Sequence, residues 1–284
     1  AAFRSLKMRD PECELLFFRD GFRGLARRLD SSSDRRVDRR AVRGIIHRGG
    51  TFIGTGRVPE LVLPPEDAPN FADRLAARDD FLKVAAINLY QMRVDNLIVI
   101  GGDGSFRGAR LIGDAFRSHF PKRPFRVIGI PGTIDNDLHG TDYSIGYDTA
   151  LNNVVDALRK LRDTIESHRR AIILEVMGNT SGWLALQSAI AGGAAVVAIP
   201  EVEETWEHDQ IVRRLVAGVR RDYRYFIIVV AEGVMRRAGA DWCESLRRKI
   251  EADKTIDAHL GHPLEVRINS VGHVARGGSP SALD

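Results

Sequence analysis

The sequence predicts an α/β fold with an open, largely parallel sheet and helices on both of its faces. Short apolar runs alternate with longer helical stretches, and the runs are β-branched and apolar on both faces. Glycine-rich and acidic clusters follow several of these runs directly. Strands buried on both faces are typical of parallel sheets, and helical crossovers are the connections that parallel pairing needs.

Each expected strand is a short apolar run, and each expected helix is a longer stretch beside such a run. The expected strands are 14–18, 96–100, 125–130, 171–176, 194–199, 225–230 and 264–269. The expected helices lie near 79–93, 105–118, 144–168, 181–192, 207–221 and 241–258. The acidic, proline-containing stretch 63–69 is expected to be an exposed loop. In open α/β sheets ligands bind beyond the carboxyl ends of the strands, so functional residues are expected just after each apolar run.

Composition excludes several classes of protein. The 284 residues are 44% hydrophobic and 28% charged, which is ordinary for a globular protein and excludes disordered, collagenous and coiled-coil chains. No apolar run approaches the ~20 residues of a transmembrane helix. The 2 cysteines, Cys13 and Cys243, cannot form a disulfide framework or a four-thiolate metal site. A reducing cytoplasm is therefore the expected compartment.

The charge balance is slightly basic, with 42 Lys and Arg against 38 Asp and Glu, and most of these cations are arginine. Most arginines are expected on solvated faces. The alternative is that a few converge on an anionic small molecule, since a guanidinium binds phosphate through two parallel hydrogen bonds. Nucleic-acid binding is disfavoured because the basic residues are spread along the chain and interleaved with acids.

A glycine-rich turn, Gly101-Gly102-Asp103-Gly104-Ser105, follows the expected strand 96–100 and precedes a helix. Glycines let backbone amides approach a phosphate, and the helix N-terminus adds partial positive charge. Asp103 could hold Mg²⁺ directly or through water. A tight strand-to-helix turn would require glycine as well, so a purely structural role stays open. The motif lacks the lysine of a Walker loop.

A second cluster, Pro-Gly-Thr-Ile-Asp-Asn-Asp at 131–137, follows the expected strand 125–130. Asp135 and Asp137, with the Thr133 hydroxyl nearby, form an acid/base and metal cluster. One carboxylate can accept a proton from a substrate hydroxyl while the other orders the cation. Asp-Asn-Asp is also ordinary turn chemistry, but its position at a second strand end favours a function.

The segment 49–57 contains four glycines and two threonines and ends at Arg57. It could wrap a polyphosphate, with Arg57 neutralising charge during phosphoryl transfer. A flexible surface loop is the alternative. The segment 175–182 lies at another strand end, and its small hydroxyls and backbone amides suit a sugar or a phosphate. Met177, taken alone, is typical of core packing.

Two further features complete the set. The segment 272–278 places His273 and Arg276 three residues apart, so a helix would present them on one face toward an anion. Arg267 lies in the preceding strand. Glu232 follows the strand 225–230, at one more strand end, although an exposed acid usually has no function.

Taken together, these stretches resemble the ATP-dependent 6-phosphofructokinase family, A type. The matching segments occur in the family's order and spacing over essentially the whole chain, at 49–57, 101–108, 131–150, 175–193 and 272–280. The turn 101–104 alone also resembles NAD kinases and lipid kinases, whereas the segments 131–137 and 272–278 do not.

The resemblance implies a glycolytic transferase that moves the γ-phosphoryl group of ATP to O1 of fructose 6-phosphate, with Mg²⁺. It implies that Asp135 is the base on the sugar hydroxyl, that Thr133 contacts the transferred group and that Arg57 stabilises its charge. The implied metal ligand is Asp103, with Asp137 nearby. The implied ATP contacts are Arg57, Val58, Gly102, Asp103, Gly104 and Ser105. The implied sugar contacts are Thr133, Asp135, Asp137, Met177, Gly178, Asn179, Glu232, His273 and Arg276.

The family's architecture implies two doubly wound domains with mostly parallel sheets and the active site in the cleft between them. The nucleotide-binding domain would comprise 1–146 and 275–284, and the sugar-phosphate-binding domain would comprise 147–274. The family's first strand and phosphate loop would precede Ala1, and its closing helices would follow Asp284, so the chain is expected to be truncated at both ends.

Arg170 and Arg267 are implied to reach the 6-phosphate of a neighbouring subunit's substrate. The resemblance therefore implies a homo-oligomer, a dimer or a tetramer, with shared active sites. Small-molecule substrates are the expected partners, without nucleic acid or membrane.

Several features bear on the alternatives. Pyrophosphate-dependent members look bulkier, with an acid in place of Gly104 and a lysine in place of Gly132, so ATP is favoured here. Asn179 stands where similar bacterial members carry an arginine, and Ala195 stands where allosteric members carry a glutamate. Met8 replaces an effector-site arginine, whereas Arg4 and Arg162 match. Pyrophosphate-dependent transfer and a catalytically weak, ligand-binding subunit remain alternatives.

Overall fold

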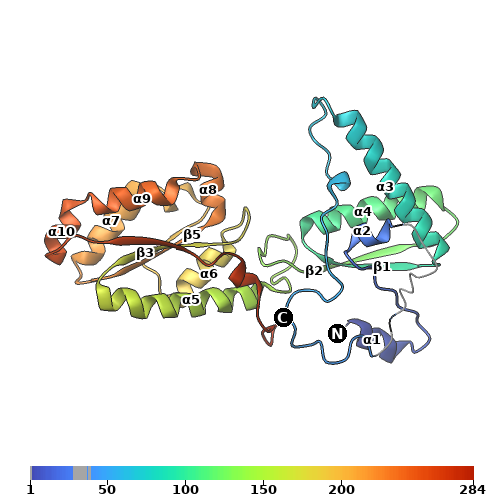
Figure 1. The fold of residues 1–284 in the computed structure, drawn as a ribbon, viewed down its shortest axis with the longest axis horizontal. Helices are drawn as coiled ribbons and strands as arrows, with labels where there is room; N and C mark the ends of the chain where they lie inside the picture. Colours follow the sequence, from blue (N-terminus) through green and yellow to red (C-terminus); the bar gives the residue numbers. More distant parts are fainter. Residues whose placement is uncertain (1, 28–36, 38–39) are drawn as a thin grey trace. The chain divides into compact units, whose positions relative to one another are not determined.

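The computed structural model describes residues 2–27, 37 and 40–284 (Figure 1). The chain divides into two compact units, Ala1–Ile130 and Pro131–Asp284. The predicted domain boundary near residue 146, and the predicted return of 275–284 to the first domain, stay predictions.

The second unit is built on a four-stranded sheet in the order β4-β5-β3-β6. Its strands are β3 (Ala171–Val176), β4 (Val196–Ala198), β5 (Phe226–Ala231) and β6 (Val266–Ser270). The pairs β3–β5, β3–β6 and β4–β5 are all parallel. In register, Val176 lies opposite Ala231 and Glu175 lies opposite Ser270, so the carboxyl ends of these strands share one edge of the sheet.

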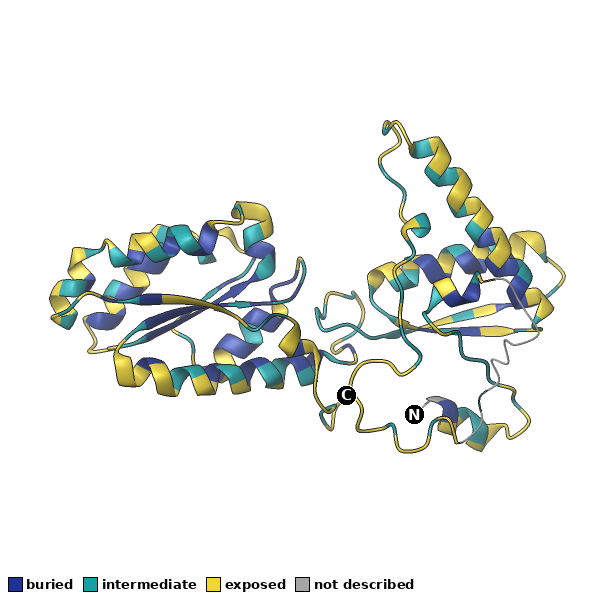
Figure 2. Cartoon of the chain, viewed as in Figure 1, coloured by how far each residue is buried: buried dark blue, intermediate teal, exposed yellow. Residues whose placement is uncertain are grey.

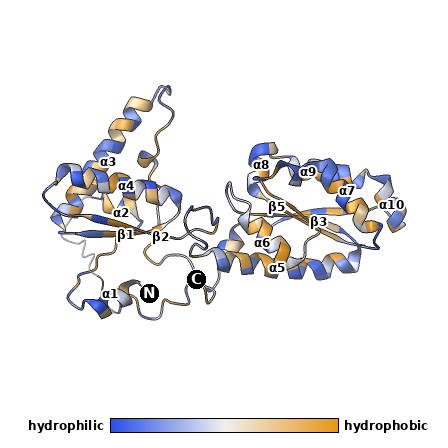
Figure 3. Cartoon of the chain, turned by 180° about the vertical axis from the view of Figure 1, so that it is seen from behind, coloured by the Kyte–Doolittle hydropathy of each residue, from blue (hydrophilic) through white to orange (hydrophobic). Residues whose placement is uncertain are grey.

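Helices cover both faces of this sheet, as the apolar runs predicted. One face carries α5 (Tyr147–His168) and α6 (Trp183–Gly192), and the other carries α7 (His208–Val219), α9 (Trp242–Glu251) and α10 (Lys254–Leu260) (Figure 1). Figure 2 shows β3 and β5 as buried strands, and Figure 3 shows α6 as a largely hydrophobic segment.

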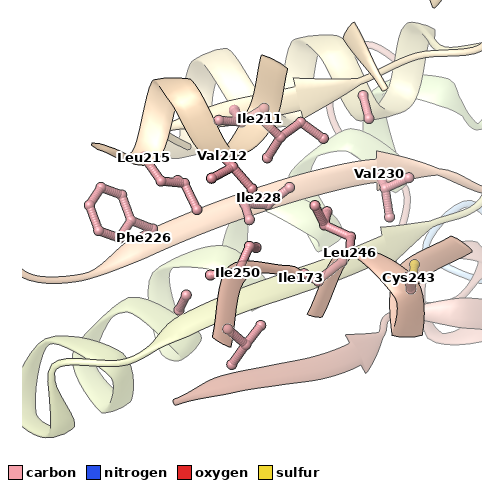
Figure 4. Close-up of a cluster of buried hydrophobic side chains, with 14 of the residues drawn as sticks. Ile173, Ile211, Val212, Leu215, Phe226, Ile228, Val230, Cys243, Leu246 and Ile250 are labelled. Carbon is pink, nitrogen blue, oxygen red and sulfur yellow. The ribbon is translucent and has the colours of Figure 1, made fainter. Parts of the chain in front are cut away.

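Successive residues of the central strands supply the two cores. Ile173 and Ile228 pack with Leu215 of α7 and Leu246 of α9, as Figure 4 shows. The neighbouring residues, such as Leu174 and Val229, pack on the opposite side with residues of α5 and α6. This alternation explains why β5 is apolar at every position and β3 at every position except Glu175.

Carboxylate side chains cap the starts of two helices in the second unit. The predicted helix 241–258 is in fact two helices, because the Asp253 carboxylate accepts the backbone N–H groups of Thr255 and Ile256 and starts α10 there. At the start of α5, the Asp284 carboxylate accepts the N–H groups of Gly146 (2.8 Å) and Thr149 (2.7 Å). A short helix that was not predicted, α8 (Glu232–Ala238), follows β5 directly.

The first unit contains a two-stranded sheet of β1 (Asn96–Gly101) and β2 (Arg126–Pro131). The last residue of β2, Pro131, is the first residue of the second unit. The sheet packs against α2 (Phe22–Leu25), α3 (Phe71–Gln91) and α4 (Asp103–His119). Leu97 and Val99 enter a core that includes Leu89, Ile112 and Phe116. The unit begins with α1 (Ala2–Arg9), and the stretch 63–69 is a loop before α3, as predicted.

The predicted strand 14–18 is wrong, because within it only Leu16 forms an isolated β-bridge. Two of its apolar side chains, Phe17 and Phe18, make packing contacts that the structure describes. Phe17 makes edge contacts with Phe3 and Phe52, at centroid distances of 6.4 and 5.5 Å. Phe18 packs against the core of the first unit. The apolar character of Phe17 and Phe18 therefore reflects side-chain packing rather than strand pairing.

In the described part of the chain, no helix has both the length and the apolar character that crossing a membrane requires.

Candidate active site

The predicted site residues divide between the two units. Arg57, Val58 and the turn 102–105 belong to the first unit, whereas the predicted base and the sugar contacts belong to the second. The convergence of Asp103 and Arg57 with Asp135 stays a prediction.

The glycine-rich turn of the first unit is a tight connection from β1 to α4. A Cβ atom on Gly101 would lie 2.4 Å from Ser105 Oγ, so only glycine fits there. The Gly102 carbonyl accepts the N–H groups of Ser105 (3.0 Å) and Phe106 (3.1 Å), which forms the first turn of α4. A Cβ atom on Gly104 would meet nothing within 4 Å. The turn is thus structurally constrained at Gly101 and open to approach at Gly104.

Asp103 is the first residue of α4, and its carboxylate is 52% exposed and pairs with Arg107 one turn further on. No group of three or more His, Cys, Asp or Glu side chains suited to a metal occurs among the described residues. Mg²⁺ is usually held by one or two carboxylates together with substrate phosphates and water. A single exposed carboxylate beside an open turn fits that mode of binding.

The segment 49–57 lies against residues 20–23. The Asp20 N–H donates to the Ile53 carbonyl (2.9 Å), and the Arg23 guanidinium donates to the Arg57 carbonyl (2.9 Å). Gly54 has φ +75°, and a Cβ atom there would lie 2.9 Å from the Asp20 carboxylate. The segment is therefore held in place by its neighbours, while the Arg57 side chain is exposed.

In the second unit, the loop 131–146 is closed by Asn136. Its side chain accepts the Ser144 N–H (2.9 Å) and donates to the Asp142 carbonyl (3.0 Å), and its φ is +49°. The Thr133 hydroxyl accepts the Asp135 N–H (3.2 Å), and the Thr133 carbonyl accepts the Ser144 hydroxyl (2.6 Å). Asn136 thus provides the turn chemistry that the sequence suggested as an alternative, and the carboxylates flank it.

Asp135 is half-buried, and its burial raises the pKa of its carboxyl group. The negative charges of Asp137 and Glu232 raise this pKa further, whereas the Thr133 hydrogen bond and the Arg276 charge lower it. The structure therefore brings these predicted residues of the second unit into electrostatic contact with one another. A carboxylate with a raised pKa is suited to accept a proton near neutral pH.

Glu232 is bound to the loop that follows β3. Its carboxylate accepts the Asn179 N–H at 2.6 Å. The first turn of α8 approaches this loop closely, since a Cβ atom on Gly233 would lie 3.0 Å from the Asn179 carbonyl oxygen. Met177 and Gly178 lead into the same loop, and Gly178 has φ +151°. The predicted contacts after β3 and after β5 are therefore neighbours.

Sequence reasoning missed two residues here. Glu201, just beyond β4, accepts the Gly182 N–H at 2.7 Å. Arg236 of α8 donates to the Asn179 side-chain oxygen at 2.6 Å. Glu201 lies within three residues of a strand end, and the same signal identified Glu232. Arg236 could be found only once α8 was known.

His273 and Arg276 lie in a 3₁₀ turn, η3 (Gly272–Arg276), directly after β6. Residues three apart eclipse each other in such a turn, so the two side chains share a side as predicted. Both side chains are exposed.

Arg170 and Arg267 lie at the opposite edge of the same sheet. Arg170 immediately precedes β3, and Arg267 pairs in register with Ile172 near the amino end of β3. Glu265, which was not predicted, contacts the Arg170 guanidinium (2.5 Å) and also pairs with Arg267. These arginines are thus held together, away from the strand ends that carry Glu232 and Asn179.

Comparison with known proteins finds similar chains along the whole sequence. The family model for phosphofructokinase matches residues 1–284. An ATP-dependent 6-phosphofructokinase of Listeria welshimeri is 42% identical over 264 residues, which cover 93% of this chain and 69% of the relative.

Solved structures show the same similarity. A phosphofructokinase from Saccharomyces cerevisiae superposes with a TM-score of 0.75 at 31% identity, covering 96% of this chain and 35% of that one. The T-state structure from Pichia pastoris superposes with a TM-score of 0.76 at 29% identity, covering 96% of this chain and 28% of that one. This chain therefore spans about a third of the length of each yeast chain. With the glycine-rich turn and the carboxylate cluster, these matches establish that the chain belongs to the phosphofructokinase family.

Proposed function

We propose that the protein transfers the γ-phosphoryl group of ATP to O1 of fructose 6-phosphate, giving fructose 1,6-bisphosphate. The observation that carries this proposal is the half-buried Asp135, whose pKa is raised by burial and which interacts with Glu232 and Arg276. The relatives named ATP-dependent 6-phosphofructokinase support the same activity.

In the proposed reaction, Asp135 accepts the proton of the sugar 1-hydroxyl as its oxygen attacks the γ-phosphorus. The new O1–P bond forms while the bond to the β,γ-bridging oxygen breaks, and ADP leaves. The Thr133 hydroxyl, which accepts the Asp135 N–H and also hydrogen-bonds the Asp135 carboxyl group, is proposed to contact an oxygen of the transferred group. Arg57 neutralises the charge on that group.

The sugar phosphate is proposed to bind at the strand ends of the second unit, to Asp137, Met177, Gly178, Asn179, Glu232, His273 and Arg276. The nucleotide is proposed to bind Val58 and the turn 102–105. Asp103 would hold Mg²⁺, which neutralises phosphate charge when it is bound with the nucleotide. The open space at Gly104 supports ATP over pyrophosphate as the donor.

Arg170 and Arg267 are proposed to bind the 6-phosphate of a substrate in a neighbouring subunit. Their position at the amino edge of the sheet, away from Glu232 of the same chain, supports this assignment. The protein is accordingly proposed to be a homo-oligomer with shared active sites.

A coupled assay on the natural full-length protein tests the function. Fructose 1,6-bisphosphate should form with ATP and not with pyrophosphate. Turnover with pyrophosphate alone would identify the other donor. Binding of fructose 6-phosphate without turnover with either donor would favour a ligand-binding subunit.

Arg267→Ala is expected to raise the KM for fructose 6-phosphate by about tenfold or more, because a charged hydrogen-bond donor to the phosphate is lost. Steady-state kinetics at saturating ATP measure the change. Arg248→Ala is the matched control, since Arg248 is an exposed arginine paired with Glu244 on α9. An unchanged KM in Arg267→Ala would remove Arg267 from the phosphate site.

Asp137→Asn is expected to move the acid limb of the kcat/KM profile to lower pH. The Asp137 charge raises the pKa of Asp135, so removing it lowers that pKa. The base must be deprotonated to act, and a lower pKa keeps it deprotonated in more acidic solution. If the limb stays where it is in the unaltered protein, it reports a group other than Asp135.

A further inference from the structure

The short helix α8 presents two charged side chains toward the loop that follows β3. Glu232 and Arg236 are four residues apart, so they lie on one face of the helix. Gly233 allows the first turn of α8 to approach Asn179, because any side chain there would press against the Asn179 carbonyl (3.0 Å) and Pro200 (2.9 Å). This close approach brings the Arg236 guanidinium within reach of the loop.

Arg236, Asn179 and Glu232 form a closed ring of contacts. Arg236 Nη1 donates to Asn179 Oδ1 at 2.6 Å, and Arg236 Nη2 lies 3.6 Å from Glu232 Oε1. The same Glu232 oxygen accepts the Asn179 N–H at 2.6 Å. Asn179 is held with φ +56°, a left-handed conformation that asparagine tolerates better than most residues. The ring therefore fixes the backbone and the side chain of Asn179 as well as the Glu232 carboxylate.

The surroundings of this ring are rich in carboxylates. Burial raises the pKa values of Asp135 and Glu175. The charges of Asp137 and Glu232 raise the pKa of Asp135 further, and the charge of Glu232 raises that of Glu175. Arg276 is the cation that acts on Asp135. An anionic sugar phosphate approaching these carboxylates would be repelled, and each guanidinium nearby reduces that repulsion. The Arg236 side chain is 56% exposed, against 20% for Glu232, so its charge also faces the solvent from which a ligand arrives.

We infer that Arg236 is a positioning residue for the sugar phosphate, which orients Asn179 and Glu232 toward the ligand and offsets the negative charge around them. The inference rests on the proposed function, because it requires Asn179 and Glu232 to contact the sugar. Arginine suits this role since its planar fork can donate to two acceptors at once, which a lysine cannot reproduce.

Three variants of the natural full-length protein test the inference. Arg236→Gln is expected to raise the KM for fructose 6-phosphate by about tenfold or more, with the KM for ATP unchanged. Arg236→Lys, which keeps the charge without the fork, should recover part of the loss. Arg237→Gln is the matched control, because Arg237 lies on the same helix and its guanidinium donates to the Pro200 carbonyl (2.8 Å). That variant should keep the KM for fructose 6-phosphate, even if its melting temperature falls.

Calorimetric titration with fructose 6-phosphate in the absence of ATP separates this inference from the function itself. If the unaltered protein neither binds nor phosphorylates the sugar, the proposed function fails and the inference fails with it. If the unaltered protein binds the sugar and Arg236→Gln binds it equally well with the same KM, the inference alone is overturned. An equal rise of KM in Arg237→Gln would also overturn it, since α8 would then act only as a structural support.

Discussion

Replacing Asp135 with asparagine is expected to lower kcat by about 10²–10⁴-fold, the usual contribution of a general base, with little change in the affinity for fructose 6-phosphate. A base acts in the transition state, whereas asparagine can still make a ground-state hydrogen bond to the sugar. The environment of Asp135 strengthens this expectation, because burial, followed by the charges of Asp137 and Glu232, keeps its pKa above the usual value and so improves its match to neutral pH.

Single-turnover kinetics and calorimetry measure the two quantities separately. Asp142→Asn is the matched control, because Asp142 lies in the same loop, is exposed, and contributes its backbone carbonyl to Asn136. Near-normal turnover in Asp135→Asn would assign the base to another residue. A parallel loss in Asp142→Asn would attribute the effect to the loop as a whole.

Replacing Ile228 with alanine is expected to destabilise the second unit by about 2–5 kcal/mol, the usual range for such a truncation in a core. Ile228 is 0% exposed in the central region of β5 and packs with residues of α7 and α9 (Figure 4). Because Ile228 does not reach the surface, truncating its side chain leaves a cavity inside this core.

Urea unfolding, followed by a probe in the second unit, measures the change in the free energy of unfolding. Ile190→Ala provides the control, since Ile190 of α6 is 74% exposed and should change stability by less than about 0.5 kcal/mol. Equal losses in the two variants would show that burial in this core is not what stabilises the unit.

The β-α alternation was predictable because β5 is apolar at every position and β3 is apolar at every position except Glu175. Ile172 and Ile173 face opposite cores, and this pattern is visible in the sequence without any knowledge of the partners. The run 14–18 is also apolar after Glu14, yet the ring of Phe17 packs on Phe3 and Phe52. Composition identifies residues that will pack against others, but it does not show whether those residues will form a paired strand.

Helix boundaries depended on contacts that a linear pattern does not reveal. Asp253 divides a single amphipathic stretch because its carboxylate caps a new helix, and α3 begins at Phe71, earlier than the predicted residue 79. The short α8 was missed because seven residues after a strand give too little periodicity to detect.

The candidate site was predictable where function coincides with a strand end. Glu232 and Asp135 were identified by that rule, and the structure brings them into electrostatic contact. Arg236 and Glu265 could not be found in this way, because their importance comes from the side chains they touch. Arg236 contacts Asn179, and Glu265 joins Arg170 to Arg267.

The hydrogen bonds from the Gly146 and Thr149 N–H groups to the Asp284 carboxylate link two stretches of chain more than 130 residues apart. Gly146 is also the last residue of the loop that carries Asp135. Loss of these two hydrogen bonds would free the residue at which this loop ends. The position of the proposed base, Asp135, would thus depend on Asp284, which is not among the proposed substrate contacts. Selection for turnover would act on both residues.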